Sequence, residues 1–317
     1  MKDISEYSDS DLESIIIINK IYRKCLLKKS IGMMDEIGLR WKNSLSETDH
    51  AELKKLKVPQ IIVDEILANI RPRDKSLFEI AESNYYRTIG KVIYNLSPAE
   101  RVFYDNALSL PFYCTHATSV RNVETHNPKL IKENTAKLKL NSWYTLKQKG
   151  LGMRNKFIPQ RNISSAVIGN DDFIFFSLEV GSSLKKCSSR FGRRMYRVPI
   201  ESNLAFRYSL ITLNNLLTHK NNPVKLSMPD VIPDIRRLKF KYNPIDIIAV
   251  GEIKKFVICS LIKTFRSLPM SQQDLLLSYR DDYHINILIN SFFRPQICVP
   301  HRFYSRTGEY EVHELLE

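Results

Sequence analysis

The first hundred residues follow a helical pattern of apolar and polar positions. Between residues 10 and 29, apolar side chains recur at three- and four-residue intervals with lysines and arginines between them, which is typical of an amphipathic helix. Similar spacing predicts further helices over 47–56, 59–70, 76–94 and 98–108. The last of these has a strong start signal, because Ser97 precedes Pro98 and Glu100 occupies the third helical position.

Near residue 110 the pattern changes to one typical of β-strands. Runs rich in aromatic and β-branched residues predict strands over 112–118, 172–180, 194–200, 296–299 and 310–315. A short helix that ends at a glycine is expected over 140–150, and helical spacing returns over 205–217, 252–268 and 272–280. We therefore expect an α+β fold with a helical region over 1–105, a β-rich domain over 106–317, and a helical insertion at about 205–293.

The two regions differ in net charge. The formal net charge is +14, yet residues 1–105 hold 17 basic and 17 acidic side chains, so the whole excess lies in 106–317. A basic domain attracts polyanions such as a nucleic acid, a membrane surface, a dinucleotide or an acidic protein, and charge alone does not choose among them. The longest aliphatic run, 15–18, is too short to span a membrane.

The 5 cysteines are scattered and no two have C-x-x-C spacing. Such scattered cysteines predict neither a zinc site nor a disulfide framework, and we expect no metal ion. Free thiols fit a reducing compartment.

Six short motifs follow one another through the β-rich domain. In chain order they are CTHAT (114–118), L-x-x-x-G-L (146–151), NDDFIFFSLE (170–179), SSRFG (188–192), YRVPI (196–200) and EYEVHE (309–314). Their order resembles that of the ADP-ribosyltransferase superfamily, and within it the OspC/CopC family of type III effector arginine ADP-riboxanases. The resemblance covers about residues 106–317, and it implies a split, mostly antiparallel β core. The ankyrin repeats that follow the catalytic domain in other members are not found before Glu317.

The resemblance implies an NAD-dependent reaction on an arginine of a host protein. ADP-ribose would be transferred to the guanidinium, and attack of the ribose 2′-OH on the guanidinium carbon would then release ammonia. The resemblance also implies secretion by a type III system, action in the host cell cytoplasm and activation by host calmodulin. Neither a nucleic acid nor a membrane is an expected partner.

The site residues are also implied by the resemblance. The residues expected to bind NAD⁺ are Thr115, His116, Phe175, Phe176, Ser177, Arg190 and Phe191. A threonine is also considered at position 117 of the CTHAT motif, and no contact with NAD⁺ is assigned to it. The residues expected to act in catalysis are Asp172, Glu309, Glu311 and His313. We expect NAD⁺ to lie between the strand of His116 and the strand of Glu311.

Each role has a chemical reason. Glu311 would hold the ribose 2′-OH and stabilise the cationic transition state, and His116 would orient the ribose. One phenylalanine would stack on nicotinamide, and Arg121, Arg190 or Arg193 would bind the pyrophosphate. Because a guanidinium is a poor nucleophile, Glu309 or Asp172 would orient it or take its proton. His313 would assist the loss of ammonia.

Structural alternatives accompany these roles. His116 has apolar neighbours and also fits a core histidine, and some of the phenylalanines over 173–176 must be core residues. Glu309, Glu311 and His313 alternate with apolar residues, as they would on a solvated edge strand. Asp172 also fits a turn.

Three competing functions remain open. The first is ordinary arginine mono-ADP-ribosylation without loss of ammonia. The second is a non-enzymatic nucleic-acid binder, although no zinc finger, helix-turn-helix or RNA-binding motif is found. The third is a non-enzymatic calmodulin-binding protein, because the basic helix 252–268 spaces Phe256 and Phe265 as calmodulin targets do. Residues 14–29 have a similar character, and both helices also fit a core position.

Overall fold

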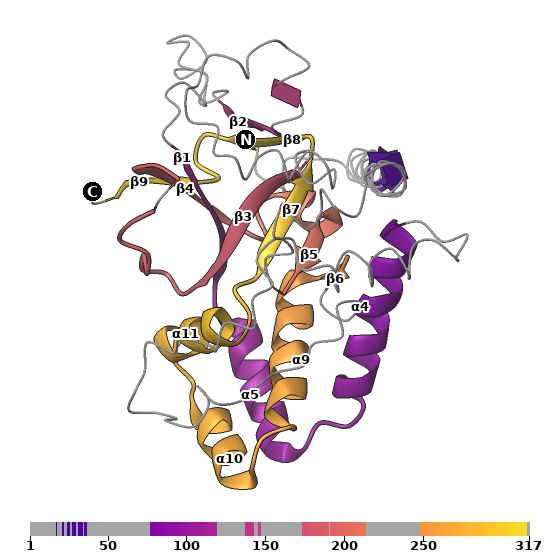
Figure 1. The fold of residues 1–317 in the computed structure, drawn as a ribbon, viewed down its shortest axis with the longest axis vertical. Helices are drawn as coiled ribbons and strands as arrows, with labels where there is room; N and C mark the ends of the chain where they lie inside the picture. The colour runs from indigo at the N-terminus through magenta and orange to yellow at the C-terminus, as the bar shows by residue number, and fades with distance from the viewer. Residues whose placement is uncertain are drawn as a thin grey trace, which may run out of the picture.

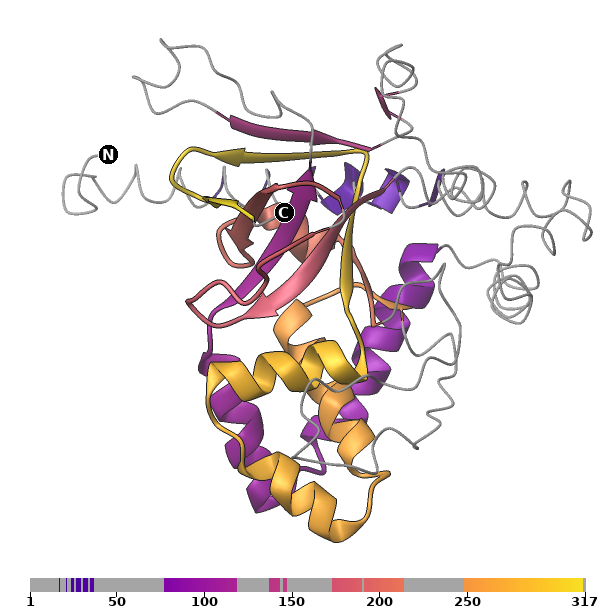
Figure 2. The same cartoon turned by 60° about the vertical axis from the view of Figure 1, so that its left-hand side comes forward.

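A computed structural model describes residues 77–118, 137–142, 145–146, 173–189, 191–213 and 248–315, together with several helical positions between 17 and 36. Helices gather at one end of a β-sheet, and a second, two-stranded sheet lies at the opposite end (Figures 1 and 2). The prediction of an α+β fold with antiparallel strands is therefore confirmed. No helix in the described ranges is long and apolar enough to cross a membrane.

The main sheet has seven strands in the order β6-β5-β7-β3-β1-β4-β9, and every neighbouring pair is antiparallel. In chain order its strands are β1 (Phe112–Thr118), β3 (Phe173–Val180), β4 (Arg194–Pro199), β5 (Leu210–Thr212), β6 (Ile248–Ala249), β7 (Gln296–Pro300) and β9 (Glu311–Glu314). The second sheet pairs β2 (Lys137–Asn141) with β8 (Arg302–Arg306).

Strands β1 and β3 pair over only part of their length. Their register runs from Phe112 opposite Val180 to Thr115 opposite Ser177. Beyond this point β1 continues along β4 as far as Thr118, while β3 runs along β7 from Phe173. The centre of the sheet thus divides after Thr115 and Ser177.

The described helices are α4 (Leu77–Ile93), α5 (Pro98–Ser109), α9 (Ile253–Phe265), α10 (Met270–Ser278) and α11 (Asp282–Phe292). Helix α5 begins as predicted, because Ser97 and Glu100 form a reciprocal capping box. Glu100 also accepts hydrogen bonds at 2.8 and 2.9 Å from Arg266, just after α9. This ion pair joins two helices that are far apart in the sequence.

Helix α9 lies at the centre of the helical layer and contacts α4, α5, α10 and α11. Its residues 256–262 are buried, as are Ile253 and Phe265. A helix that is apolar on most sides belongs in a core. The calmodulin-like spacing of Phe256 and Phe265 is accordingly core packing in this structure.

Three aromatic side chains join the two sheets. Phe176 of β3 packs against Phe303 of β8 at 4.9 Å and against Phe206 at 5.2 Å between ring centroids. Phe206 lies in the short 3₁₀ helix η4 (Leu204–Tyr208). All three rings are fully buried, so they form one hydrophobic cluster between β3, β8 and η4.

Most predicted elements agree with the structure, but not in the insertion and not at residues 140–141, which were predicted as the start of a helix and belong to β2; β8 and α11 were not predicted. Residues 205–213, predicted as helix, form η4 and β5, and β5 and β6 extend the main sheet rather than a separate helical unit. Residues 210–212 are all buried, and this sheet contact outweighs a weak local helical preference. The expected boundary at residue 105 falls inside α5. The helices predicted over 47–70 lie outside the described residues.

Candidate functional site

Polar side chains form a row across four strands of the main sheet. Ser177 of β3 lies opposite Thr115 of β1, Thr115 lies opposite Arg197 of β4, and Arg197 lies opposite Glu311 of β9. Residues opposite one another in register project from the same face of a sheet. His313, Glu179 and Tyr113 lie two positions along their strands, and they therefore share that face.

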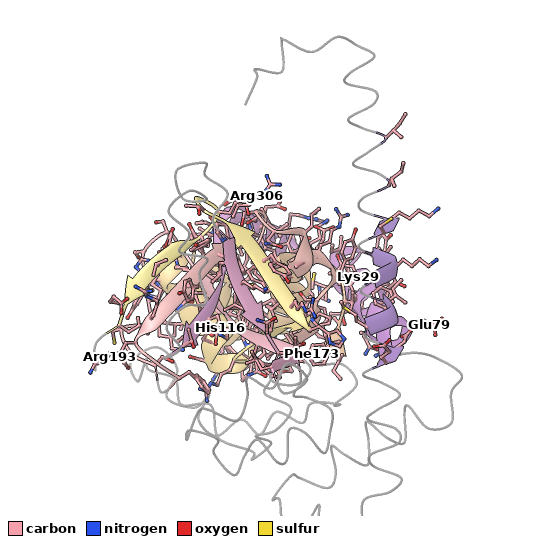
Figure 3. The ribbon with its side chains drawn as sticks, turned by 90° about the horizontal axis from the view of Figure 1, so that it is seen from above. Lys29, Glu79, His116, Phe173, Arg193 and Arg306 are labelled. Carbon is pink, nitrogen blue, oxygen red and sulfur yellow. The ribbon has the colours of Figure 1, made fainter. Side chains whose placement is uncertain are left out.

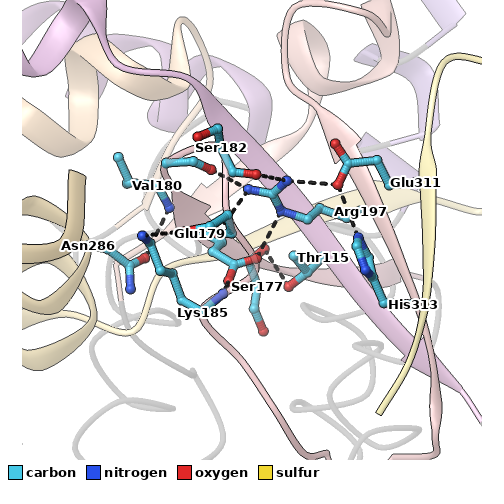
Figure 4. Close-up of polar contacts among 12 residues, drawn as sticks. Thr115, Ser177, Glu179, Val180, Ser182, Lys185, Arg197, Asn286, Glu311 and His313 are labelled. Carbon is cyan, nitrogen blue, oxygen red and sulfur yellow. Dashed lines mark hydrogen bonds and ion pairs between the residues drawn. The ribbon is translucent and has the colours of Figure 1, made fainter.

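Arg197 is the centre of this row and its side chain is 0% exposed. Its Nε donates to Glu179 Oε2 at 3.2 Å, and its Nη1 donates to Glu311 Oε2 at 2.8 Å (Figure 4). The guanidinium also donates to the backbone carbonyls of residues 181–183. It also contacts the ring of Tyr113, whose centroid lies 3.4 Å from the guanidinium carbon. A buried arginine is tolerated only with such complete pairing.

Glu311 is the accessible end of this arrangement, with 44% of its side chain exposed. Its Oε2 accepts from Arg197 and also from His313 Nε2, at 3.0 Å. No hydrogen bond to its Oε1 comes from the residues that the structure describes, so this oxygen keeps its capacity to accept one.

Two opposing effects act on the Glu311 carboxyl. Partial burial raises its pKa, but the hydrogen bonds and charges of Arg197 and His313 outweigh burial, so the pKa lies below its usual value. The carboxylate is therefore ionised at neutral pH.

The charges of this group do not cancel. Glu179 and Glu311 carry two negative charges against the single positive charge of Arg197, when His313 is counted as neutral. The nearby Lys185 is paired with Asp282 at 3.3 Å. Among the ion pairs that the structure describes for these side chains, the carboxylates exceed the guanidinium by one negative charge, and the half-exposed Glu311 would attract a cationic group.

The segment after β3 completes the support of Arg197. Gly181 has φ 104°, and a Cβ at this position would overlap the carboxylate of Asp282 in α11. The neighbouring Val180 N donates to Asn286 Oδ1 of α11 at 3.0 Å. Glycine is therefore required here both by backbone conformation and by the close approach of the helix.

His116 lies where β1 and β3 separate. Its Nδ1 donates to the carbonyl of Phe175 at 2.9 Å, and its ring centroid lies 5.5 Å from that of Phe176. Burial lowers its pKa below the usual value, although the bond to Phe175 acts in the opposite direction. The ring is therefore neutral near pH 7, with Nε2 as the nitrogen that carries a lone pair.

The structure does not bring His116 and Glu311 together on one face. His116 lies opposite Tyr196, and Tyr196 lies opposite Val312, in the row next to that of Glu311. Adjacent rows project to opposite faces, and β4 lies between β1 and β9. The expectation of a cleft walled by these two side chains was therefore wrong. Seen from above, His116 lies between Arg193 and Phe173 (Figure 3).

The residue that follows His116 is Ala117, so the expectation of a threonine at position 117 was wrong. The second threonine of the CTHAT motif is Thr118. Ala117 is half-buried in β1 and lies opposite Met195 of β4. Its methyl side chain can neither donate nor accept a hydrogen bond, so position 117 adds no polar group to a binding site.

The other predicted NAD⁺-binding residues are dispersed. Phe176 is 1% exposed and belongs to the core, so it cannot stack on a ligand in this structure. Phe175 is half-buried, and alternation along β3 puts it on the face of Ser177, which is exposed. Thr115 is buried and its hydroxyl donates to Ser177 O at 3.4 Å. Phe191 is 62% exposed.

Among the predicted catalytic residues, Glu311 and His313 are in contact and Glu309 is apart from them. Glu309 precedes β9, and its Oε2 accepts from Ser305 Oγ at 3.2 Å and from Arg306 N at 2.8 Å. The prediction that Glu309 shares a strand face with Glu311 was wrong, because its carboxylate closes the β8–β9 turn. Asp172 and Arg190 lie outside the described residues.

Arg197 and Glu179 were missed as site residues, although both lie in motifs that the sequence shows. Arg197 is the arginine of YRVPI in β4, and Glu179 is the one charged residue within the otherwise mostly apolar β3. A single charge inside a buried stretch of strand is a recognisable signal, because it is not stable in a core without an opposite charge.

In the described part of the chain no group of three histidine, cysteine or acidic side chains could hold a metal ion. A scan against protein-family models finds no match for the chain, and no curated protein matches it.

Proposed function

We propose that this chain is an NAD-dependent arginine ADP-riboxanase in which Glu311 is the principal catalytic residue. The observation that carries the proposal is the state of this carboxylate. It is ionised and half-exposed on the last strand, with Oε2 held by Arg197 and Oε1 open to a ligand. The order of the motifs, with Glu-x-His at the end, adds the class of reaction.

The residues fit the transfer half of this reaction. NAD⁺ would supply the ADP-ribosyl group, with nicotinamide as the leaving group. Glu311 Oε1 would accept a hydrogen bond from a ribose hydroxyl, and the uncompensated negative charge would stabilise positive charge on the sugar. The same charge would attract the guanidinium of the acceptor arginine.

His313 would act in the second half of the reaction, in which ammonia is lost. Because its Nε2–H donates to Glu311, its Nδ1 is the nitrogen left to accept or deliver a proton. In that step the 2′-oxygen forms a bond to the guanidinium carbon, the bond from this carbon to one nitrogen breaks, and ammonia leaves with the transferred proton. A host protein substrate, calmodulin activation, type III secretion and action in the host cytoplasm belong to the same proposal and rest on the resemblance.

The test uses the full chain, biotin-labelled NAD⁺ and a host cell lysate, with and without calmodulin. We expect label on host protein that is lost in Glu311→Gln. The matched control is Glu314→Gln, because Glu314 lies on the same strand, is exposed and pairs with Arg194 on the other face.

The mass of the modified arginine decides the reaction type. An adduct lighter than ADP-ribosyl-arginine by one ammonia supports riboxanation, whereas the full mass supports ordinary mono-ADP-ribosylation. Absence of label from the wild-type chain under both conditions would contradict an NAD-dependent enzyme, and binding without turnover would favour a non-enzymatic role.

A further inference from the structure

We infer that Arg197 is a positioning residue that fixes Glu311 Oε2 and so makes Oε1 the oxygen that meets the ligand. The inference concerns the orientation and ionisation of Glu311, and only the identity of the ligand rests on the proposed function. Arg197 itself is fully buried and would not touch a ligand.

The guanidinium is held from several directions at once. Glu179 binds Nε, the carbonyls of Gly181, Ser182 and Ser183 bind the two terminal nitrogens, and Tyr113 covers its face. Without Glu311 the group would still have these partners. Because Arg197 cannot follow Glu311, the carboxylate must take the position that Arg197 sets.

The number of carboxylates argues against a purely structural ion pair. Glu179 alone balances the charge of Arg197 and is as buried as its partner, with side-chain exposures of 6% and 0%. Glu311 is a second carboxylate that the buried cation does not require. Its exposure of 44% is unlike that of a core ion pair, but suits a group that is anchored at one oxygen and accessible at the other.

The support of Arg197 extends to α11. Gly181 packs against Asp282, Lys185 Nζ binds Asp282, and Lys185 N donates to Glu179 Oε1. Figure 4 shows Ser182 and Lys185 of this segment beside Arg197 and Glu179. The orientation of Glu311 therefore depends on the segment 181–185 and, through the contacts with Asp282, on the start of α11.

The groups that act on Glu311 come from four elements. His313 lies on its own strand, Arg197 on β4, Glu179 on β3, and the paired Lys185 and Asp282 lie beyond Glu179. Partial burial opposes the ionised carboxylate, while Arg197 and His313 favour it and keep the pKa of Glu311 below its usual value. Removal of Arg197 should consequently raise the pKa of Glu311.

The decisive variant is Arg197→Met combined with Glu179→Gln. It removes the buried cation and its buried counter-charge together, so that no unpaired charge is left in the core and Glu311 is kept. The matched control is Arg194→Met, because Arg194 lies on the same strand and its ion pair with Glu314 is exposed. Arg197→Lys is a second variant that retains the charge but loses the fork of donors.

Two measurements separate positioning from stability. Carboxyl-carbon NMR should show the pKa of Glu311 raised in the double variant and unchanged in Arg194→Met. With NAD⁺ as substrate, kcat should fall about 100-fold while KM changes less than about threefold, and the acid limb of the pH profile should move to higher pH. Arg197→Lys should keep the low pKa of Glu311 and lose part of kcat.

A double variant that keeps wild-type circular dichroism, Glu311 pKa and kcat would overturn the inference. If the double variant does not fold, Arg197→Lys decides, because wild-type kcat in that variant would contradict a role for the fork geometry. A wild-type chain without NAD⁺ turnover would overturn the proposed function instead, and the NMR titration would still decide whether Arg197 controls Glu311.

Discussion

The buried pair Arg197–Glu179 should dominate the response of the fold to mutation at the site. In Arg197→Met, Glu179 is left as an unpaired carboxylate whose side chain is 6% exposed. Breaking a buried ion pair by removal of one partner costs about 3–5 kcal/mol. Glu311 adds at most about 1 kcal/mol to this loss, because its 44% exposure lets water replace Arg197.

A double-mutant cycle with Glu179→Gln tests the reasoning. Once Glu179 is neutral, the loss of Arg197 leaves carbonyls at residues 181–183, and those of Ser182 and Ser183 belong to exposed residues that water can reach. We therefore expect the double variant to lose less than the sum of the two single variants, by about 2 kcal/mol or more. Of a total stability of about 5–15 kcal/mol, such a difference is readily resolved.

Urea unfolding followed by circular dichroism provides the free energies for all four proteins. Additivity within about 0.5 kcal/mol would refute the claim that the two charges stabilise each other in the core. So would a loss below about 1 kcal/mol in Arg197→Met, since that is the range of an exposed ion pair.

Three further outcomes follow from the structure. Glu311→Gln should lower kcat/KM for NAD⁺ by about 100- to 1000-fold in a turnover assay, with the unfolding midpoint almost unchanged because the residue is half-exposed. Glu100→Gln should lower the melting temperature at pH 7. The hydrogen bonds from Arg266 hold the pKa of Glu100 below its usual 4.5, so its contribution is present above that pH and is lost as the pH falls through the lower, folded-state value; melting curves of both proteins should therefore converge in acid. Gly181→Ala should destabilise the fold by about 1–3 kcal/mol in urea and reduce turnover, because the new Cβ meets Asp282 and displaces the carbonyls that hold Arg197; wild-type turnover would contradict that coupling.

Local patterns in the sequence determined most of the secondary structure. The start of α5 follows from Ser97, Pro98 and Glu100, whose capping interactions are made within four residues. Strands β1 and β3 were predicted within one residue of their observed bounds, because runs of aromatic and β-branched residues have few alternatives to a buried strand. Strand β5 was missed, since three residues carry too little pattern and its stability comes from β6 and β7.

The chemistry of the site was predicted in part. Glu311 and His313 share a strand face by simple alternation, and the structure has them in contact. Glu309 fits the same alternation, yet β9 begins only at Glu311 and the turn before it uses the Glu309 carboxylate. Where a strand begins depends on its partner, here β4, and not on the alternation itself.

The sequence by itself therefore determined the type of most long elements, although not of α11, and the residues that alternate along the predicted strands. Only the tertiary structure decided that β4 lies between β1 and β9, so that His116 and Glu311 project from opposite faces. The same arrangement brings Arg197 between Glu179 and Glu311, which are 132 positions apart in the chain. Strand order and register depend on contacts between distant segments, and no local pattern encodes which buried charge will meet which partner.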